Sequence, residues 1–561
     1  MYRLISFISF PIIIATLSIY AGIVNVPGDE VSIQGGINAA VSGDTVLVAD
    51  STYYENINFE GKSITVASHY IMDEDTNHIV NTVINGLFPY HPDSGSVVYF
   101  ISGEDTNSVL CGFTITGGTG TPVMVNQDLW RAGGGVCCVG ASGAKLINNR
   151  ITENRVSGQR TVGGGVFFMG NNGFFILKGN HISKNVSASS GRGEAGGVEI
   201  TGDNVNIRVV ENIFERDTVV AQGFAVAGGL YIKGSPLVSG VIQGNEFREN
   251  IADATTGGGG AAGLIVIRSE TEIRDNLFEN NVGKSRDSFA VGEALDIEDP
   301  QAGEYSRKIL VGNRFINNLV SSQFHNARGG AIQIFRTLAT VSGNYFEQNT
   351  AQGGTATGGA IRIHESAYRL ENNLFSRNTS SNYCGAIYIS GIPSLATDKD
   401  IINNTFVNNT APQQGGGVCV DLNAGAVMVN SILWGNSPDQ IATANGGTID
   451  VRYTDVQSGW FGEGNIDLEP LFADTIDFKL SDASPCIGAG IDSIEVDGIW
   501  YHAPPIDMAG NPRPNPSGSL PDMGAWESPL RSPVGIEDSP PDNLVRTYSL
   551  GQNYPNPFNP T

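Results

Sequence analysis

Residues 358–378 read GGAIRIHESAYRLENNLFSRN and contain the two signatures that decide the fold. A glycine pair opens a run in which apolar and variable residues alternate, as in Ile361, Arg362 and Ile363. An Asn-x-Phe-x-x-Asn signature follows from Asn373 to Asn378. Its first Asn recurs at intervals of 29 to 33 residues, with one interval of 37, at Asn149, Asn180, Asn212, Asn245, Asn276, Asn313, Asn344, Asn373 and Asn404. Such regularity predicts a solenoid of stacked repeats.

The repeat is a strand repeat. Apolar residues alternate with variable ones after each glycine pair, which places one set inside and the other outside. The three-and-four spacing of helical repeats does not occur. The sequence therefore predicts an all-β fold, a single-stranded right-handed parallel β-helix over residues 22–436 with an N-terminal helical cap, whose coils stack about 4.8 Å apart.

The two regular columns of the repeat are expected to be structural. An Asn at a turn can take the left-handed conformation and hydrogen-bond its copy in the next coil, which satisfies buried polar groups. The recurring Phe, such as Phe375, is expected to stack in the core. Neither column is expected to carry chemistry.

The N-terminal region predicts a signal peptide followed by a cap. Residues 1–21 combine Arg3 with an apolar run, the pattern of a cleaved signal peptide. Ile33, Ile37 and Val41 would lie on one face of a short helix that covers the first coil. No later segment is long and apolar enough to predict a membrane span.

Composition limits the partners and cofactors. A net charge of −25 without a basic cluster argues against nucleic acid and anionic membranes. Six cysteines in 561 residues do not form a disulfide framework, and Cys111, Cys419 and Cys486 have no partner implied by spacing. No zinc spacing occurs. Asp73, Asp75 and Asn77 imitate the start of a calcium loop, but the Gly and the closing Glu are missing, so no cofactor is predicted and calcium is not indicated by a motif.

The C-terminal region departs from the repeat. Residues 437–527 are rich in Pro and Gly, with a few bulky apolar residues, and are expected to cover the open end of the stack. Residues 528–545 have the composition of a linker. Residues 546–561 form a last segment, which ends TYSLGQNYPNPFNPT.

Four stretches resemble known families. Residues 32–68 resemble the N-terminal cap of secreted pectin-lyase-like β-helix proteins, and the GGA and FxxN signatures resemble the repeats of polymorphic outer-membrane proteins, which are bacterial surface β-helices used in adhesion. Residues 465–527 resemble a choice-of-anchor terminal region of exported proteins. Residues 548–561 resemble the opening of a type IX secretion sorting domain, which would be truncated at Thr561.

These resemblances imply an exported protein, secreted or held at the outer cell surface, that uses the type IX secretion machinery. They imply a fold and a location rather than a reaction. The function expected from them is a glycan- or partner-binding, adhesive scaffold whose partner is an extracellular polysaccharide or a cell-surface molecule.

The alternative is a polysaccharide lyase or glycoside hydrolase that works in a groove on the outer face. Lyases of this fold use a calcium-binding carboxylate cluster with an Arg or Lys base, and inverting hydrolases use paired carboxylates that flank a water. No Asp-Asp pair and no Gly-His-Gly motif occurs. No catalytic residue and no metal ligand is therefore predicted.

The remaining candidates lie on the outward side of the strand after each glycine pair. Asp296 and Glu298 project from the same side of one strand, and Arg362 lies two coils further, on the order of 10 Å away. Such a face can be an ordinary solvated sheet, can bind a sugar chain or cation, or can hold an acid and a base. The ligand-binding candidates are Tyr231, Lys233, Asp296, Glu298, Arg362 and His364.

Overall fold

The computed structural model describes residues 21–533 except 90, 92, 126, 293, 300–304 and 392–397. The predicted signal peptide (apart from Ala21), the predicted sorting segment and most of the predicted linker lie outside the described residues. Within the described residues, no helix is long and apolar enough to cross a membrane.

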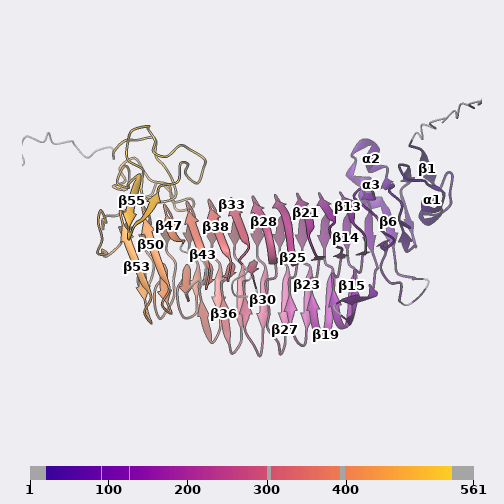
Figure 1. Ribbon diagram of the computed structural model, residues 1–561, viewed down its shortest axis with the longest axis horizontal. Coiled ribbons are helices and arrows are strands. Elements are labelled where there is room, and N and C mark those ends of the chain that lie inside the picture. Colours follow the sequence, from indigo (N-terminus) through magenta and orange to yellow (C-terminus); the bar gives the residue numbers. More distant parts are fainter. Residues whose placement is uncertain are drawn as a thin grey trace, which may run out of the picture.

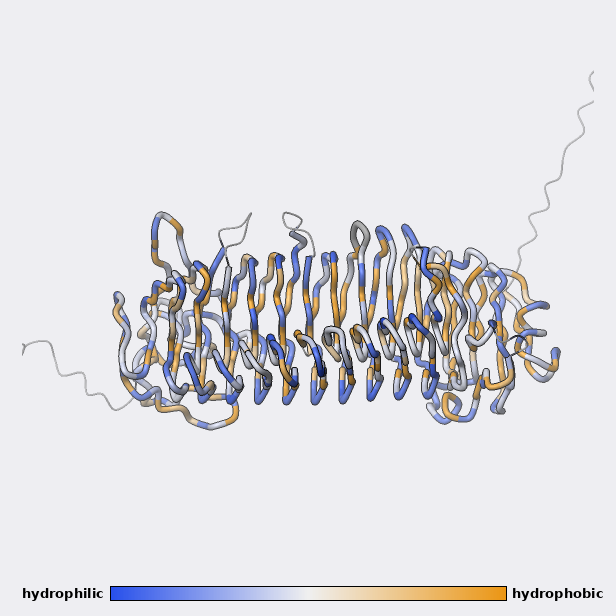
Figure 2. Tube along the Cα trace, turned by 90° about the horizontal axis from the view of Figure 1, so that it is seen from below, coloured by the Kyte–Doolittle hydropathy of each residue, from blue (hydrophilic) through white to orange (hydrophobic). Residues whose placement is uncertain are grey.

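The chain forms a right-handed parallel β-helix, as predicted (Figure 1). One coil contains β12 (Val136–Val139), β13 (Gly143–Ile147), β14 (Arg150–Thr152) and β15 (Arg155–Val162). Each pairs in parallel with its counterpart one coil on, namely β16 (Val166–Met169), β17 (Phe174–Lys178), β18 (His181–Ser183) and β19 (Val186–Glu194). Figure 2 shows hydrophobic and hydrophilic residues alternating along successive coils.

Three rows of strands surround the core. Row 1 follows each glycine pair and contains β4 (Ile57–Asn58), β7 (Val98–Phe100), β12, β16, β20 (Val198–Gly202), the first parts of β25 (Leu230–Gln243) and β28 (Leu264–Arg274), β32 (Leu295–Glu298), β37 (Ile332–Phe335), β42 (Ile361–His364), β46 (Ile387–Ser390), β49 (Val418–Asp421) and β52 (Ile441–Thr443). Row 2 contains β1 (Ile23–Val26), β2 (Thr45–Val48), β5 (Thr65–Ser68), β8 (Val109–Cys111), β13, β17, β21 (Val205–Val210), the second parts of β25 and β28, β33 (Arg307–Val311), β38 (Leu338–Ser342), β43 (Ala367–Glu371), β47 (Lys399–Ile402), β50 (Gly425–Val429) and β53 (Thr448–Arg452).

Row 3 carries the Phe column. It contains β3 (Ser51–Tyr53), β6 (Thr82–Asn85), β9 (Thr114–Thr116), β14, β18, β22 (Ile213–Glu215), β26 (Glu246–Arg248), β29 (Leu277–Glu279), β34 (Arg314–Ile316), β39 (Tyr345–Glu347), β44 (Leu374–Ser376), β48 (Thr405–Val407), β51 (Ile432–Trp434) and β54 (Asp455–Val456). From Phe214 to Phe406 the rings stack with centroids 4.7 to 4.9 Å apart. The predicted core column is confirmed.

A further layer leaves the core after row 3 and returns before the next glycine pair. We call it the side sheet, and in Figure 1 it hangs below the three rows. Small residues such as Ala252 and Ala254 fill the space between its outgoing and returning strands. It contains β10 (Thr121–Val125), β11 (Asp128–Ala132), β15, β19, β23 (Thr218–Ala221), β24 (Ala225–Val226), β27 (Ile251–Ala254), β30 (Val282–Ser285), β31 (Ala290–Val291), β35 (Leu319–Ser322), β36 (Asn326–Arg328), β40 (Thr350–Gln352), β41 (Thr355–Thr357) and β45 (Thr379–Ser380).

Two amide ladders join the coils at the corners of row 3. The backbone N–H and Nδ2 of Asn313 donate to Oδ1 of Asn344, at 2.8 and 3.0 Å, and Nδ2 also donates to the carbonyl of Ile273 at 2.8 Å. The second ladder runs in the same way from Asn154 to Asn436, with Asp217 as one member. The predicted hydrogen bonds between copies are confirmed.

The predicted left-handed conformation of the ladder Asn is wrong. The residue before it has the positive φ, for example Asn148 at 52° and Asn372 at 52°. This residue makes the corner bend, so the ladder Asn itself can point into the stack with its amide free to pair.

The N-terminal helix α1 (Ile33–Ala39) covers the first coil, and Ile33 and Ile37 enter the core. The side chain of Ser32 caps it by accepting a hydrogen bond from the backbone N–H of Gly35 at 3.0 Å. Val41 does not share the buried face as predicted, because the helix ends at Ala39 and leaves Val41 exposed. Two short helices follow, α2 (Tyr70–Asp73) and α3 (Thr76–Asn81).

The C-terminal region divides into an end cover and a side cover. The coils continue past residue 436 to β54, and Trp460 packs against the end of the core. Most of the rest, including the hairpin β55 (Ser493–Val496) and β56 (Ile499–His502), lies along the side of the last coils rather than over the end, where it was expected.

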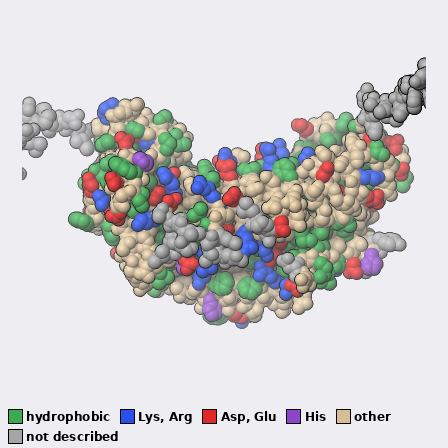
Figure 3. Space-filling view, viewed as in Figure 1, with side chains coloured by type: hydrophobic (Ala, Val, Ile, Leu, Met, Phe, Trp, Pro, Cys, Tyr) green, Lys and Arg blue, Asp and Glu red, His purple; other side chains and the backbone are tan. Residues whose placement is uncertain are grey.

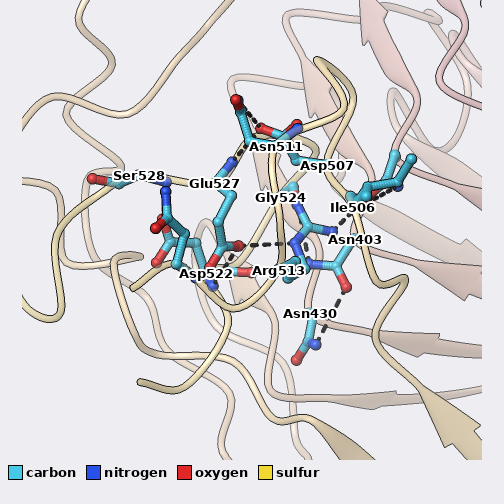
Figure 4. Close-up of polar contacts among 12 residues, drawn as sticks. Asn403, Asn430, Ile506, Asp507, Asn511, Arg513, Asp522, Gly524, Glu527 and Ser528 are labelled. Atoms are coloured by element: carbon cyan, nitrogen blue, oxygen red, sulfur yellow. Dashed lines mark hydrogen bonds and ion pairs between the residues drawn. The ribbon is translucent and has the colours of Figure 1, made fainter. Parts of the chain in front are cut away.

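A buried ion pair fastens this side cover (Figure 4). Arg513 Nε lies 2.8 Å from Glu527 Oε2, and Arg513 Nη1 donates to Oδ1 of Asn372 at 2.6 Å. Asn403 donates to the carbonyls of Asp522 and Gly524. Asn372 and Asn403 are corner residues of successive coils. The side cover therefore binds to the corners that precede the ladder.

Cys384 and Cys419 form a disulfide, so Cys419 has a partner that its spacing in the sequence did not indicate. Cys384 stands where the preceding coil has Gly358, in a left-handed conformation with φ of 61°. The turn at Cys384 lies beside the first outward residue of the row 1 strand in the next coil, and that residue is Cys419. The free cysteines of the described chain, Cys111, Cys137, Cys138 and Cys486, are buried.

Candidate functional site

The side sheet and row 1 form the two sides of a groove that runs along the coil axis. Cavities of about 340 and 210 Å³ are lined from both sides, for example by Thr355 and Thr357 of the side sheet and by Tyr388 of row 1. In Figure 3, Lys and Arg side chains lie among Asp and Glu side chains along the middle of the face that shows row 2 and the side sheet.

The floor of the groove corrects the sequence prediction. The first outward residue of each row 1 strand was expected to face solvent, but Tyr231, Asp296 and Arg362 are only 2%, 4% and 8% exposed. The returning strands of the side sheet cover them. The second outward residue is half-buried, and this column contains Lys233, Glu298 and His364.

The wall of the groove is a column of side-sheet residues in register from coil to coil. The guanidinium of Arg160 lies 5.5 Å from the Trp130 ring centroid, and that of Arg192 lies 5.7 Å from the Phe224 ring centroid. Such cation–π contacts hold the planar groups side by side. In chain order the column is Trp130, Arg160, Arg192, Phe224, Gly258, Phe289, Asn326 and Thr355.

Phe224 and Phe289 remain 43% and 39% exposed on this wall. A Cβ on Gly258 would lie 2.9 Å from the Phe289 ring and 3.2 Å from the Phe224 ring, so the two rings meet over the glycine. The wall therefore presents a flat aromatic surface between arginines. The wall could not be found from the sequence, because the side-sheet segments differ in length from coil to coil and this hides the register of the wall residues.

The centre of the groove is acidic. Glu199 is buried, its Oε2 has no hydrogen-bond partner, and burial together with the charge of Glu194 raises its pKa well above the usual range. Burial also raises the pKa of Glu298, with a further contribution from Asp299. Lys233 acts on the pKa of both Glu199 and Glu298 in the opposite direction, so the candidates Lys233 and Glu298 form one electrostatic group with Glu199, which was not among the candidates.

Asp296 and Arg362 belong to a buried hydrogen-bonded row. Gln333 stands between them in register, donates to Asp296 Oδ1 at 3.3 Å and accepts from Arg362 Nη1 at 3.0 Å. Burial and the charge of Glu298 raise the pKa of Asp296. The prediction that Arg362 lies two coils from Asp296 is confirmed, and the linking residue Gln333 was not among the candidates.

His364 lies beside this row. Its Nδ1 is 2.9 Å from Ser390 Oγ, and its ring stacks on Phe335 with centroids 5.6 Å apart. Burial, and then the charge of Arg362, lower the pKa of His364 to about 4. The imidazole is therefore neutral near pH 7 and acts there as a hydrogen-bonding group and a stacking surface.

A cavity of about 780 Å³ extends the floor toward the N-terminus. It follows the second outward column over five coils, from Val139 and Met169 through Lys233 to Ile267, and Val125 of β10 closes one side. Since coils repeat about every 4.8 Å, five coils span roughly 19 Å. Of the candidates, only Lys233 lines this cavity.

Among the described residues, no three His, Cys, Asp or Glu side chains are grouped so as to hold a metal ion.

A family model supports the architecture over part of the chain. Residues 304–456 match the family model described as "Right handed beta helix region". The solved structure of pectate lyase Pel9A is similar at 12% identity, covers 91% of this chain and 97% of its own, and has a TM-score of 0.29. That score is too low to carry an argument about the site. No curated protein matches the chain.

Proposed function

We propose that this protein is an exported scaffold that binds an extended polysaccharide chain in the groove between row 1 and the side sheet. The observation that carries the proposal is the wall, where exposed Phe224 and Phe289 meet over Gly258 and arginines flank them. Aromatic faces stack on pyranose rings, and neighbouring polar groups orient the hydroxyls. The coil spacing of about 4.8 Å is close to the repeat of a pyranose unit in an extended chain.

The test is binding to a panel of oligosaccharides, followed by isothermal titration of the best ligand. Phe224→Ala combined with Phe289→Ala is expected to weaken binding at least tenfold. Phe461→Ala is the matched control, since Phe461 is fully exposed and belongs to the C-terminal region. Equal affinity of the two variants would exclude the wall as the binding surface.

A second candidate is a polysaccharide lyase or glycoside hydrolase. It is favoured by the buried Glu199, whose pKa burial raises well above the usual range, as in many general acids, with Lys233 close by. Reducing-end and unsaturated-product assays on bound polysaccharides test it. Turnover that is lost in Glu199→Gln while binding persists would establish catalysis, and absence of product from every bound polysaccharide would exclude it.

The proposed location is the outer cell surface or the secreted medium, reached through the signal peptide and the type IX secretion machinery. Support comes from the sequence patterns at residues 1–21 and 548–561. Fractionation of the native host, with immunodetection of the protein, tests this part separately from binding.

A further inference from the structure

The C-terminal half of the groove holds a cluster of cationic and hydroxyl groups around one cavity. The cavity of about 210 Å³ is lined by Arg328, Thr355 and Thr357 from the side sheet and by Arg362 and Tyr388 from row 1. The pairs Arg328 and Thr357, and Arg362 and Tyr388, are each in register in adjacent coils. The cavity is therefore built from two elements that the fold holds in place.

Arg362 is unusual among the buried cations of the described chain, which are Lys308, Arg362 and Arg513. Lys308 Nζ lies 3.3 Å from Asp299 Oδ1, and Arg513 Nε lies 2.8 Å from Glu527 Oε2. Arg362 forms no ion pair with a described carboxylate, and its Nη1 donates a hydrogen bond to the neutral amide of Gln333. A buried cation without a counter-charge is costly, so an unpaired guanidinium here requires an explanation.

A second guanidinium adds to that cost. Arg328 is half-buried, stacks over the Phe289 ring at 5.8 Å from the centroid and forms no ion pair with a described carboxylate. Burial, and then the charge of Arg328, lower the pKa of Arg362 to about 10. The repulsion from Arg328 exceeds the attraction from any one neighbour, of which Tyr388 contributes most and Asp296 most among the carboxylates. Two like charges therefore face one cavity in a protein whose net charge is −25.

We propose that the cavity of Arg328 and Arg362 binds an anionic group, a carboxylate or a sulfate, carried by the chain that lies in the groove. Guanidinium groups bind planar carboxylates and sulfates through paired N–H donors, and the Thr355 and Thr357 hydroxyls can complete the set. Tyr388 is already committed, because its hydroxyl donates to Asp421 Oδ2 at 2.7 Å. The anionic substituent rests on the proposed function, whereas the anion site itself does not.

The first measurement uses small anions alone. Sodium sulfate and sodium acetate, compared with sodium chloride at equal ionic strength, are expected to raise the melting temperature of the full chain and to give saturable heats of binding. Arg328→Gln and Arg362→Gln should each lower the affinity at least tenfold, and Arg362→Lys should lose part of it. The control is Arg208→Gln, an exposed arginine of row 2.

The second measurement compares oligosaccharides of equal length that carry uronate carboxylates, sulfate esters or no charge. At least tenfold preference for one charged class, lost in Arg328→Gln, supports the proposal and identifies the anion. Equal affinity for charged and neutral chains overturns it and leaves the proposed function intact. Arginine-dependent sulfate binding without any oligosaccharide binding keeps the anion site and overturns the function. If Arg362→Gln fails to fold, the half-exposed Arg328→Gln decides.

Discussion

Two columns of buried polar groups run along this molecule, and they are built on opposite principles. The ladder repeats Asn coil after coil, and each amide gives and receives the same hydrogen bonds as its neighbours. The floor of the groove changes residue at every coil and leaves atoms such as Glu199 Oε2 without a partner. Because every member of the ladder is the same, its amides pair with one another. The floor is mixed, so some of its polar atoms remain free to bind a ligand.

The largest effect is expected from breaking the ladder. Asn313→Ala removes the acceptor for two donors of Asn276 and the donor to the carbonyl of Ile273. The Asn276 N–H and the Ile273 carbonyl lose these bonds at about 1–3 kcal/mol each, and Asn276 Nδ2 keeps only its bond to Ile242, so we expect a loss of about 4 kcal/mol in the free energy of unfolding. Urea unfolding measures it. The exposed Gln352→Ala serves as control, and a change as small as that of the control would contradict the assigned role.

The disulfide joins neighbouring coils covalently at the edge of the groove. Cys384→Gly with Cys419→Ala should lower the free energy of unfolding by about 3 kcal/mol, since the bond closes a loop with a sequence separation of 35. Glycine suits the left-handed position of Cys384. Reducing the wild-type protein is the parallel experiment, and an unchanged urea midpoint after verified reduction would contradict the expectation.

Asp217 is the exception inside the second ladder. It cannot donate as an amide does, its Oδ2 has no partner, and burial raises its pKa well above the usual range. The neutral acid stabilises the fold below the unfolded pKa of about 3.9, and this contribution is lost as pH rises through the raised folded pKa. Asp217→Asn should therefore stabilise by about 1–2 kcal/mol at pH 8 and less at pH 5.

The control for that comparison is Asn250→Asp, which puts a second carboxyl into the same ladder and should destabilise most at pH 8. Urea midpoints of the three proteins between pH 5 and 8 give the difference directly. An advantage of Asp217→Asn that does not change with pH would mean that Asp217 is already ionised across this range.

The smallest effect is expected from breaking the row in the groove. Gln333→Met removes the hydrogen bond that Arg362 Nη1 donates and the one that Asp296 Oδ1 accepts. The net change in the free energy of unfolding should be about 1 kcal/mol, well below that of Asn313→Ala. A loss as large as the ladder variant would show that the row is structural and would remove the contrast between the two columns.

The fold could be predicted because the same geometric demand recurs in every coil. A corner, a buried turn and a core each require particular residues. These residues are the glycine pairs, the Asn before each FxxN and the Phe column, and they appear in the sequence at regular intervals. The ladder pairing and the Phe stack followed from that regularity. The left-handed residue was misplaced by one position. The corner accepts Asn, Gly, Glu, Asp, Lys or Arg, so no single residue type marks it in the sequence.

The groove could be predicted only in part. The alternation correctly placed Asp296, Glu298 and Arg362 outward, but outward proved not to mean exposed. The covering strands belong to the side-sheet segment that precedes each glycine pair, and these segments vary in length and composition. The same variation hid Phe224 and Phe289, and it hid the approach of Cys384 to Cys419, which depends on how a turn in one coil faces a strand in the next.

The register of the coils has a consequence for how such a protein can change its ligand. Each coil contributes one residue to the wall and one to the floor at the same position along the groove. The groove is therefore a series of wall and floor pairs about one strand spacing apart. Deleting or duplicating a whole coil between Glu199 and Arg362 would leave both ends of the groove chemically intact and move them by one position relative to each other. The number of coils between an acidic contact and a basic contact thus sets the distance between them along the groove.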